Sequence, residues 1–232
     1  MRWSLFLAVL AVVATGCTGY VWGDNADGQL GNGTATGTAG VPTAAPSADD
    51  WFVLTAGERH TCGVEDDRTL WCWGRNRYGT IGNGAGGFGT APEPSPVQIG
   101  TGNEWRLVEG SLAGGLTHTC AIDRTKRLWC WGENSDGQVG DGTVTDRFTP
   151  VQVGAATDWT MVTAAGRHTC GIRNTDELYC WGRNSLYQLG LGDTGDRINP
   201  TRVTGSWQHV DAGTGHTCGI TTAGDLKCWG SN

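Results

Sequence analysis

Lysine is almost missing from this sequence of 232 residues. Only Lys126 and Lys227 occur, and the 23 acidic residues outnumber the 16 lysines and arginines, which gives a formal net charge of −7. A protein that binds DNA or RNA needs clustered basic side chains to replace the counterions of the phosphate backbone. The sequence has no such cluster, so we expect no nucleic-acid partner.

Helical periodicity is also missing beyond the N-terminal segment. Glycine, in contrast, is very frequent with 39 residues, and tryptophan is abundant with 12. Glycine at this level without a collagen period indicates many tight turns and therefore many short strands. The sequence thus predicts an all-β protein.

The N-terminal segment MRWSLFLAVLAVVATGC has the features of an export signal. Its apolar run, 5–13, is too short to cross a bilayer as a helix and has the length of a signal-peptide core. The small residues before Cys17 resemble a bacterial lipobox, which implies a signal peptide over 1–16 and lipidation of the Cys17 thiol. An ordinary signal peptide with an incidental cysteine is the alternative. We expect an exported protein of the cell envelope, lipid-anchored at the outer membrane or cell surface, or else secreted.

The nine cysteines divide into Cys17 and four pairs of equal spacing. An exported chain with paired cysteines is typical of a disulfide framework. The predicted disulfides join Cys62 to Cys72, Cys120 to Cys130, Cys170 to Cys180, and Cys218 to Cys228.

Each cysteine pair lies in a copy of one segment. The copies read HTCGVEDDRTLWCWG from His60, HTCAIDRTKRLWCWG from His118, HTCGIRNTDELYCWG from His168 and HTCGITTAGDLKCWG from His216. Two short strands around a polar turn predict a β-hairpin. Pairing Cys62 with Cys72 places Gly63 opposite Trp71, and the two cysteines then lie close enough at Cβ for a disulfide. Each disulfide closes a loop of roughly ten residues and stabilises the fold by about 2–3 kcal/mol.

Three further elements recur around the hairpins. An Asn- and Gly-rich turn follows each one, as at 76–82 and 134–140. A short strand with proline at its start suits an outer edge position, at 96–99, 150–153 and 200–203. A strand that starts with tryptophan completes the unit, at 51–54, 105–108, 159–162 and 207–210.

Four strands repeating near every 50 residues are typical of a β-propeller. The hairpin strands are apolar on both faces, which suits blades packed between neighbouring blades. The repeats run roughly over 22–72, 73–130, 131–180 and 181–232, within one repeat domain over 17–232.

The run W-x-x-V-x-A-G-x-x-H-T-C, followed by L-W-C-W-G-x-N-x-x-G-Q-L-G, resembles the repeat of the regulator of chromosome condensation family. The resemblance covers essentially everything after Cys17, and its disulfide form is similar to repeats of exported bacterial proteins. It implies a β-propeller, which typically has seven blades in the family. Four repeats predict a partial or open propeller, and both ends carry the same Trp-Gly strand, at Trp22 and Trp229. The expected explanations are a piece of a longer protein, an open arc whose edges invite self-association, or an unusually small ring.

Two constellations resemble metal sites, but each has a structural interpretation. His60 with Cys62 and Cys72 could form a zinc triad, yet facing thiols of an exported protein oxidise, so we expect these histidines to bond to a neighbouring turn or pack at a blade junction. The segment 134–143 resembles a calcium loop but lacks the bidentate glutamate, so turn chemistry explains it. No nucleophile constellation stands out. We predict no catalytic residue, metal or cofactor, and no enzymatic activity.

Residues that break the repeat are better candidates for function. The longer linker 82–96 contains Phe88 and Pro92, and the insertion 110–116 contains Ser111 and Leu112. We predict both as binding loops. The sequence therefore favours a non-enzymatic scaffold that binds a protein or glycan at the cell envelope and touches the membrane through its lipid alone. The family resemblance implies guanine-nucleotide exchange as an alternative, and a secreted propeller-type enzyme inhibitor is another.

Overall fold

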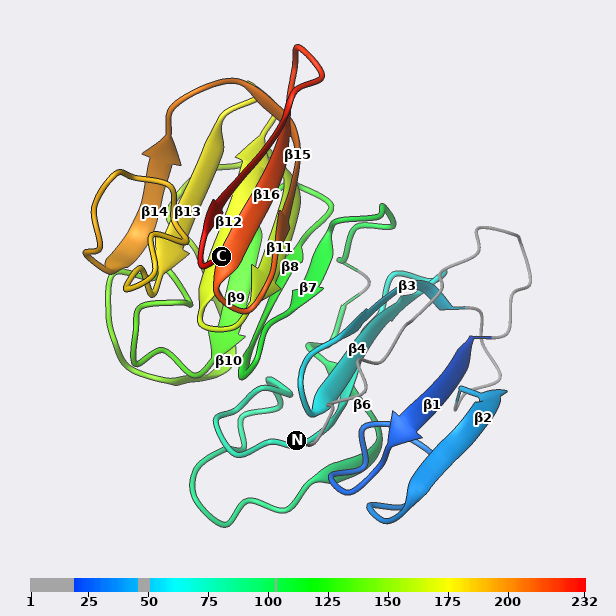
Figure 1. Ribbon diagram of the computed structural model, residues 1–232. Coiled ribbons are helices and arrows are strands. Elements are labelled where there is room, and N and C mark those ends of the chain that lie inside the picture. Colours follow the sequence, from blue (N-terminus) through cyan, green and yellow to red (C-terminus); the bar gives the residue numbers. More distant parts are fainter. Residues whose placement is uncertain (1–18, 46–50, 103) are drawn as a thin grey trace.

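The computed structural model describes residues 19–45, 51–102 and 104–232, which form 17 β-strands in five sheets (Figure 1). Among these residues there is no helix, and thus none that is long and apolar enough to cross a membrane. The predicted signal peptide and Cys17 lie outside the described residues.

Three of the sheets have four strands each, and we call them blades 1, 2 and 3. Blade 1 contains β3 (Trp51–Ala56), β4 (His60–Glu65), β5 (Leu70–Gly74) and β6 (Glu93–Ile99). Blade 2 contains β7 (Leu112–Gly114), β8 (His118–Ile122), β9 (Leu128–Gly132) and β10 (Arg147–Gln152). Blade 3 contains β11 (Trp159–Ala165), β12 (His168–Arg173), β13 (Leu178–Gly182) and β14 (Arg197–Val203).

The two remaining sheets have fewer strands. The N-terminal sheet pairs β1 (Tyr20–Asp24) with β2 (Thr38–Ala44), and blade 4 contains β15 (Trp207–Ala212), β16 (His216–Thr221) and β17 (Leu226–Gly230). Within the described part of the chain, no strand of the N-terminal sheet pairs with blade 4. The sheets follow one another in chain order, with β1 and β2 beside blade 1 (Figure 1) and blade 4 packed against blade 3. The fold is a partial, open β-propeller, as the sequence predicted.

The predicted hairpin register is confirmed. Cys62 lies opposite Cys72 and Gly63 lies opposite Trp71. All four predicted disulfides are present, one in the central hairpin of each blade. In blades 1 to 3 the strands with an internal proline, β6, β10 and β14, are the outer edges of their sheets, where a missing amide hydrogen costs no ladder bond.

The hydrophobic core is divided among the spaces between sheets. Leu70 and Ile81 of blade 1 cluster with Leu112 and Trp131 of blade 2, and equivalent clusters join each later pair of blades. A further cluster joins Val21 of the N-terminal sheet to blade 1. Each blade therefore depends on its neighbours to bury its aromatic side chains.

Blade 2 departs from the sequence prediction. The expected strand over 105–108 is wrong, because Trp105 makes a single bridge to Asp123 and β7 takes the innermost position instead. In blade 1 the equivalent of Ala121 is Gly63, where an added Cβ would lie 2.5 Å from Cε3 of the Trp51 ring. Trp105 nevertheless takes the place of Trp51, because its bridge to Asp123 matches the pairing of Trp51 with Glu65, and its ring centre lies 6.3 Å from that of Trp131. The extra residues lie before β7.

Candidate functional site

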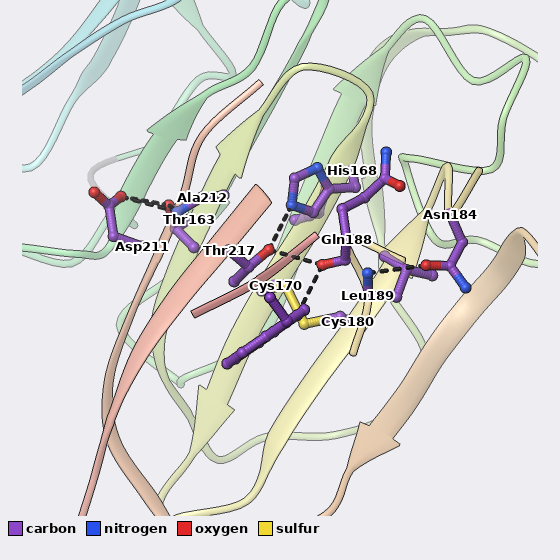
Figure 2. Close-up of a disulfide and its surroundings, with 12 residues drawn as sticks. Thr163, His168, Cys170, Cys180, Asn184, Gln188, Leu189, Asp211, Ala212 and Thr217 are labelled. Carbon is purple, nitrogen blue, oxygen red and sulfur yellow. Dashed lines mark hydrogen bonds between the residues drawn. A yellow bond between two sulfur atoms is a disulfide. The ribbon is translucent and has the colours of Figure 1, made fainter. Parts of the chain in front are cut away.

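Three of the repeated histidines join one blade to the next. Nε2 of His60 lies 2.9 Å from Oγ1 of Thr119, and the same pairing recurs at 2.8 Å for His118 with Thr169 and at 2.9 Å for His168 with Thr217 (Figure 2). Each threonine hydroxyl donates its single proton to a carbonyl of the preceding blade. The histidine must therefore donate through its Nε2–H group.

The same carbonyl groups also accept hydrogen bonds from tryptophan. The Thr80 carbonyl accepts from Thr119 Oγ1 and from Trp131 Nε1, both at 2.9 Å. The Gln188 carbonyl accepts one hydrogen bond from Thr217 Oγ1 (Figure 2) and another from Trp229 Nε1. The repeated His, Thr and Trp side chains are thus engaged in holding blades together, which confirms the predicted position of the histidines at blade junctions.

Burial keeps these histidines neutral. It lowers the pKa of His60 and of His168 to about 4 and, helped by the charges of the neighbouring histidines, the pKa of His118 to about 3. With the cysteines oxidised, these histidines have no thiolate beside them to complete a zinc site. Within the described ranges, no three His, Cys, Asp or Glu side chains are grouped so that they could hold a metal ion.

The segment that resembles a calcium loop is a turn organised by its asparagine. Oδ1 of Asn134 accepts a 2.9 Å hydrogen bond from the Val139 amide, and Nδ2 donates to the Asp141 carboxylate. Burial alone would raise the pKa of Asp141, but hydrogen bonds from Thr143 and Arg147 outweigh it and hold that pKa below its usual value. The oxygens expected for calcium are therefore occupied by protein donors.

One face of the propeller is hollowed at two adjoining places. An axial cavity of about 450 Å³ is open because its rim consists mainly of glycine and alanine at or just after the ends of the innermost strands, including Gly57, Gly115 and Gly166. A smaller cavity of about 210 Å³ adjoins it. We call the smaller cavity the arginine pocket, because it is lined by Arg59, Arg75, Arg77 and Arg167, together with Tyr78 and Glu133.

Two arginines of the pocket are neutralised by salt bridges between sheets. Arg59 lies 2.6 Å from the Asp27 carboxylate, and Arg167 lies 2.9 Å from Asp136 and 3.0 Å from Glu133. Arg75 and Arg77, in contrast, have no carboxylate of the described residues within ion-pair distance. Half of the pocket's arginines are therefore available to a ligand.

Phe88, predicted as a binding residue, lies against Arg77, which lines this pocket. Its side chain is 85% exposed, and Cζ of Arg77 lies 3.9 Å from the centre of its ring. Pro92 lies half-buried in the same linker. The structure thus brings the linker 82–96 together with the pocket.

Sequence reasoning missed Arg77 and Tyr78. A signal was present, because the other turns have Ala26, Ser135 and Ser185 at the position of Arg77. At the position of Tyr78 they have Asp27, Asp136 and Leu186. These substitutions within the repeat mark the pocket as clearly as the longer linker does.

The other predicted binding loop, 110–116, is divided between the core and the hollowed face. Ser111 and Leu112 are 2% and 6% exposed. The Ser111 hydroxyl donates a 2.8 Å hydrogen bond to the Arg106 carbonyl, and Leu112 pairs with Ala121 as Leu54 pairs with Gly63. These two side chains therefore belong to the core, whereas Leu116 of the same segment lines the arginine pocket.

Comparison with known proteins supports the architecture. The regulator of chromosome condensation (RCC1) repeat matches residues 20–64, 127–172 and 175–220, and a second form of that repeat matches 54–80 and 111–138. The Ultraviolet-B receptor UVR8 of Arabidopsis thaliana is 30% identical over 133 residues, which is 56% of this chain and 29% of the receptor. The mitochondrial RCC1 domain-containing protein RUG3 of the same plant is 28% identical over 153 residues, which is 63% of this chain and 33% of RUG3. The chain thus spans about a third of the length of these relatives.

Solved structures show the same fold. Human WBSCR16 superimposes with a TM-score of 0.78 and 19% identity, over 92% of this chain and 56% of that one. Yeast RCC1 (Prp20), bound to Kap60, superimposes with a TM-score of 0.77 and 19% identity, over 92% of this chain and 52% of that one. Repeats matching over more than half of the sequence, arranged as blades of this kind, show that the chain belongs to the regulator of chromosome condensation (RCC1) repeat family.

Proposed function

We propose that the chain is a non-enzymatic scaffold that binds a protein or glycan partner through the face containing the arginine pocket. One observation carries the proposal. The histidines of the first three hairpins bond to threonines of the next blade, whereas Arg77 and Tyr78, which break the repeat, line one hollow of that face, and Phe88 lies against Arg77. Side chains that the scaffold does not use are the ones free to contact a partner.

A structural relative supports a binding role for this architecture. Yeast Prp20 is bound to Kap60 in its complex, and a second structure of it was described with its binding properties to Gsp1p and histones. Those partners belong to Prp20. A propeller of this type is nevertheless able to present a protein-binding surface.

We further propose that the chain is exported and attached to the cell envelope by a lipid on Cys17. Four disulfides suit an oxidising compartment, and the apolar N-terminal run ends at that cysteine. Replacing Cys17→Ser should move the protein from the membrane fraction to the soluble fraction and abolish incorporation of labelled fatty acid. A variant that stays in the membrane fraction would contradict lipid anchoring.

The binding proposal is tested by cross-linking the purified chain in envelope extract from its native source. We expect a reproducible partner that Phe88→Ser largely loses. Leu226→Ser is the matched control, because Leu226 is another exposed apolar side chain, at the β16–β17 turn on the opposite face. Repeated failure to recover a specific partner would count against the scaffold, and stimulated nucleotide release from a small GTPase would favour exchange activity instead.

A further inference from the structure

We infer that the arginine pocket receives an acidic side chain of a polypeptide partner, while Phe88 packs against an apolar residue beside that acid. The inference rests on the proposed scaffold function and names the chemistry of its ligand. Four steps carry it: the charge left unpaired in the pocket, the fixed position of Arg77, the size of the cavity and the departure of this junction from the others.

The first observation is the positive charge of the arginine pocket. Arg75 and Arg77 line the pocket without a carboxylate partner among the described residues, and Nε of Arg77 is buried without a hydrogen-bond acceptor. Glu133 is engaged by Arg167, while Glu58 lies exposed at the rim. A guanidinium group presents paired donors that match the two oxygens of a carboxylate. The pocket is thus a local anion site in a chain whose net charge is −7.

The second step is the fixed position of Arg77. Its Cζ atom lies 3.9 Å from the centre of the Phe88 ring and 5.2 Å from the centre of the Tyr78 ring, distances at which a cation is attracted to an aromatic face. The Gly87 amide donates a 2.8 Å hydrogen bond to the Arg77 carbonyl, which closes the loop that delivers Phe88. A guanidinium held in this way loses little conformational freedom when it binds.

The third step is size. The cavity of about 210 Å³ is smaller than the roughly 300–1,000 Å³ typical of sites that enclose a whole small molecule. It has room for one side chain. An arginine beside an exposed aromatic ring is a combination enriched in the binding hot spots of protein interfaces. Volume and composition together favour a polypeptide over a glycan or a metabolite.

The fourth step is the contrast with neighbouring junctions. At two of them an aspartate of the preceding turn, Asp27 or Asp136, neutralises an arginine that precedes the repeated histidine. At the junction of blades 1 and 2 these two positions are Tyr78 and Thr117. No carboxylate is supplied there by the turn, so a partner can supply one.

The test uses a random dodecapeptide library displayed on phage and selected against the purified full chain. We expect enriched peptides with Asp or Glu beside an apolar residue. Binding of a synthetic selected peptide should weaken at least about tenfold with Arg77→Ser. Ser135 and Ser185 occupy the same repeat position, so this variant should keep the wild-type melting temperature. Arg183→Ser, at the repeat position of Arg75 but remote from the pocket, is the matched control and should bind as the wild type does.

A double-mutant cycle identifies the contact. Replacing the acidic residue of the peptide by its amide should weaken binding to the wild type but cause no further loss with Arg77→Ser. Peptides without acidic residues, failure to select any peptide, or Arg77-independent binding would overturn the inference. Arg77-dependent binding of a heparin oligosaccharide without peptide binding would also overturn it, in favour of an acidic glycan. In each of these cases a partner cross-linked in envelope extract would leave the scaffold function standing, whereas loss of both results would refute both.

Discussion

Blades 3 and 4 have nearly the same His-Thr-Cys segment, yet its residues lie in different environments. His168 is buried against Thr217 of blade 4, whereas His216 is exposed and has no following blade among the described residues. Likewise, both cysteines of the blade 3 disulfide are buried, whereas Cys228 of blade 4 is exposed. The burial of the motif therefore depends on the neighbouring blade and not on the motif alone.

We expect the largest difference in stability between blades 3 and 4 to come from the tryptophan that follows the second hairpin cysteine of each blade. Trp181 is fully buried at the junction of blades 2 and 3, whereas Trp229 of blade 4 is only partly buried. Trp181→Ala should lower the free energy of unfolding by about 3–5 kcal/mol, because it leaves a cavity between blades. Trp229→Ala should lower the free energy of unfolding by clearly less. Urea denaturation of the two variants measures the difference, and equal losses would show that the neighbouring blade does not decide the contribution.

We expect acid to lower the free energy of unfolding through the buried histidines. Burial lowers the pKa of His168 to about 4 from an ordinary value of 6.5, so the unfolded chain binds a proton that the folded chain refuses. The free energy of unfolding is therefore unaffected by this histidine above about pH 6.5, and it decreases as the pH falls toward 4. This difference in pKa corresponds to a loss of about 3 kcal/mol in the free energy of unfolding.

The measurement is the free energy of unfolding as a function of pH. His168→Gln, which keeps a donor for Thr217, should reduce the dependence between pH 6.5 and 4. His60→Gln, at the junction of blades 1 and 2, should reduce it in the same way. An unchanged slope for His168→Gln would contradict this account.

The disulfides should differ in their protection from reductant. With a mild thiol, Cys218 and Cys228 should be reduced and alkylated first, because Cys228 is exposed while Cys120 and Cys130 are buried. Reducing this bond should lower the free energy of unfolding by about 2–3 kcal/mol. Mass spectrometry of alkylated peptides gives the order, and simultaneous modification of all pairs would contradict it.

The smallest effect concerns the innermost strands. A Cβ at Gly171 would lie 2.9 Å from Cζ3 of Trp159, so Gly171→Ala should lower the free energy of unfolding by about 1–3 kcal/mol. The opposite exchange, Ala121→Gly, removes a methyl group without creating a clash and should cost at most about 1 kcal/mol. Thermal unfolding compares the two variants, and a greater loss for Ala121→Gly than for Gly171→Ala would contradict the steric account of Gly171.

Most of the fold was predictable because its signals are local and repeated. The hairpin register follows from the spacing of Cys62 and Cys72, and the edge position of β6 follows from Pro96. The candidate site was only half predictable. Phe88 was noticed because its linker is long, whereas Arg77 and Tyr78 were missed although they differ from the residues at the same positions of the other turns. Their contact with Phe88 is a property of the tertiary structure. Ser111 and Leu112 were misplaced because a length difference does not reveal which residues form the strand.

The sequence by itself determined the repeat, the hairpins and their disulfides, since antiparallel pairing and cysteine spacing act within about ten residues. Tertiary structure decided the rest. It set the low pKa values of the junction histidines, and it interrupted the tryptophan strand of blade 2, leaving the Trp105 bridge and β7. It also placed no carboxylate of the described residues within ion-pair distance of Arg75 and Arg77. Each of these properties depends on the space and charge that a neighbouring blade or loop supplies, which no single repeat contains.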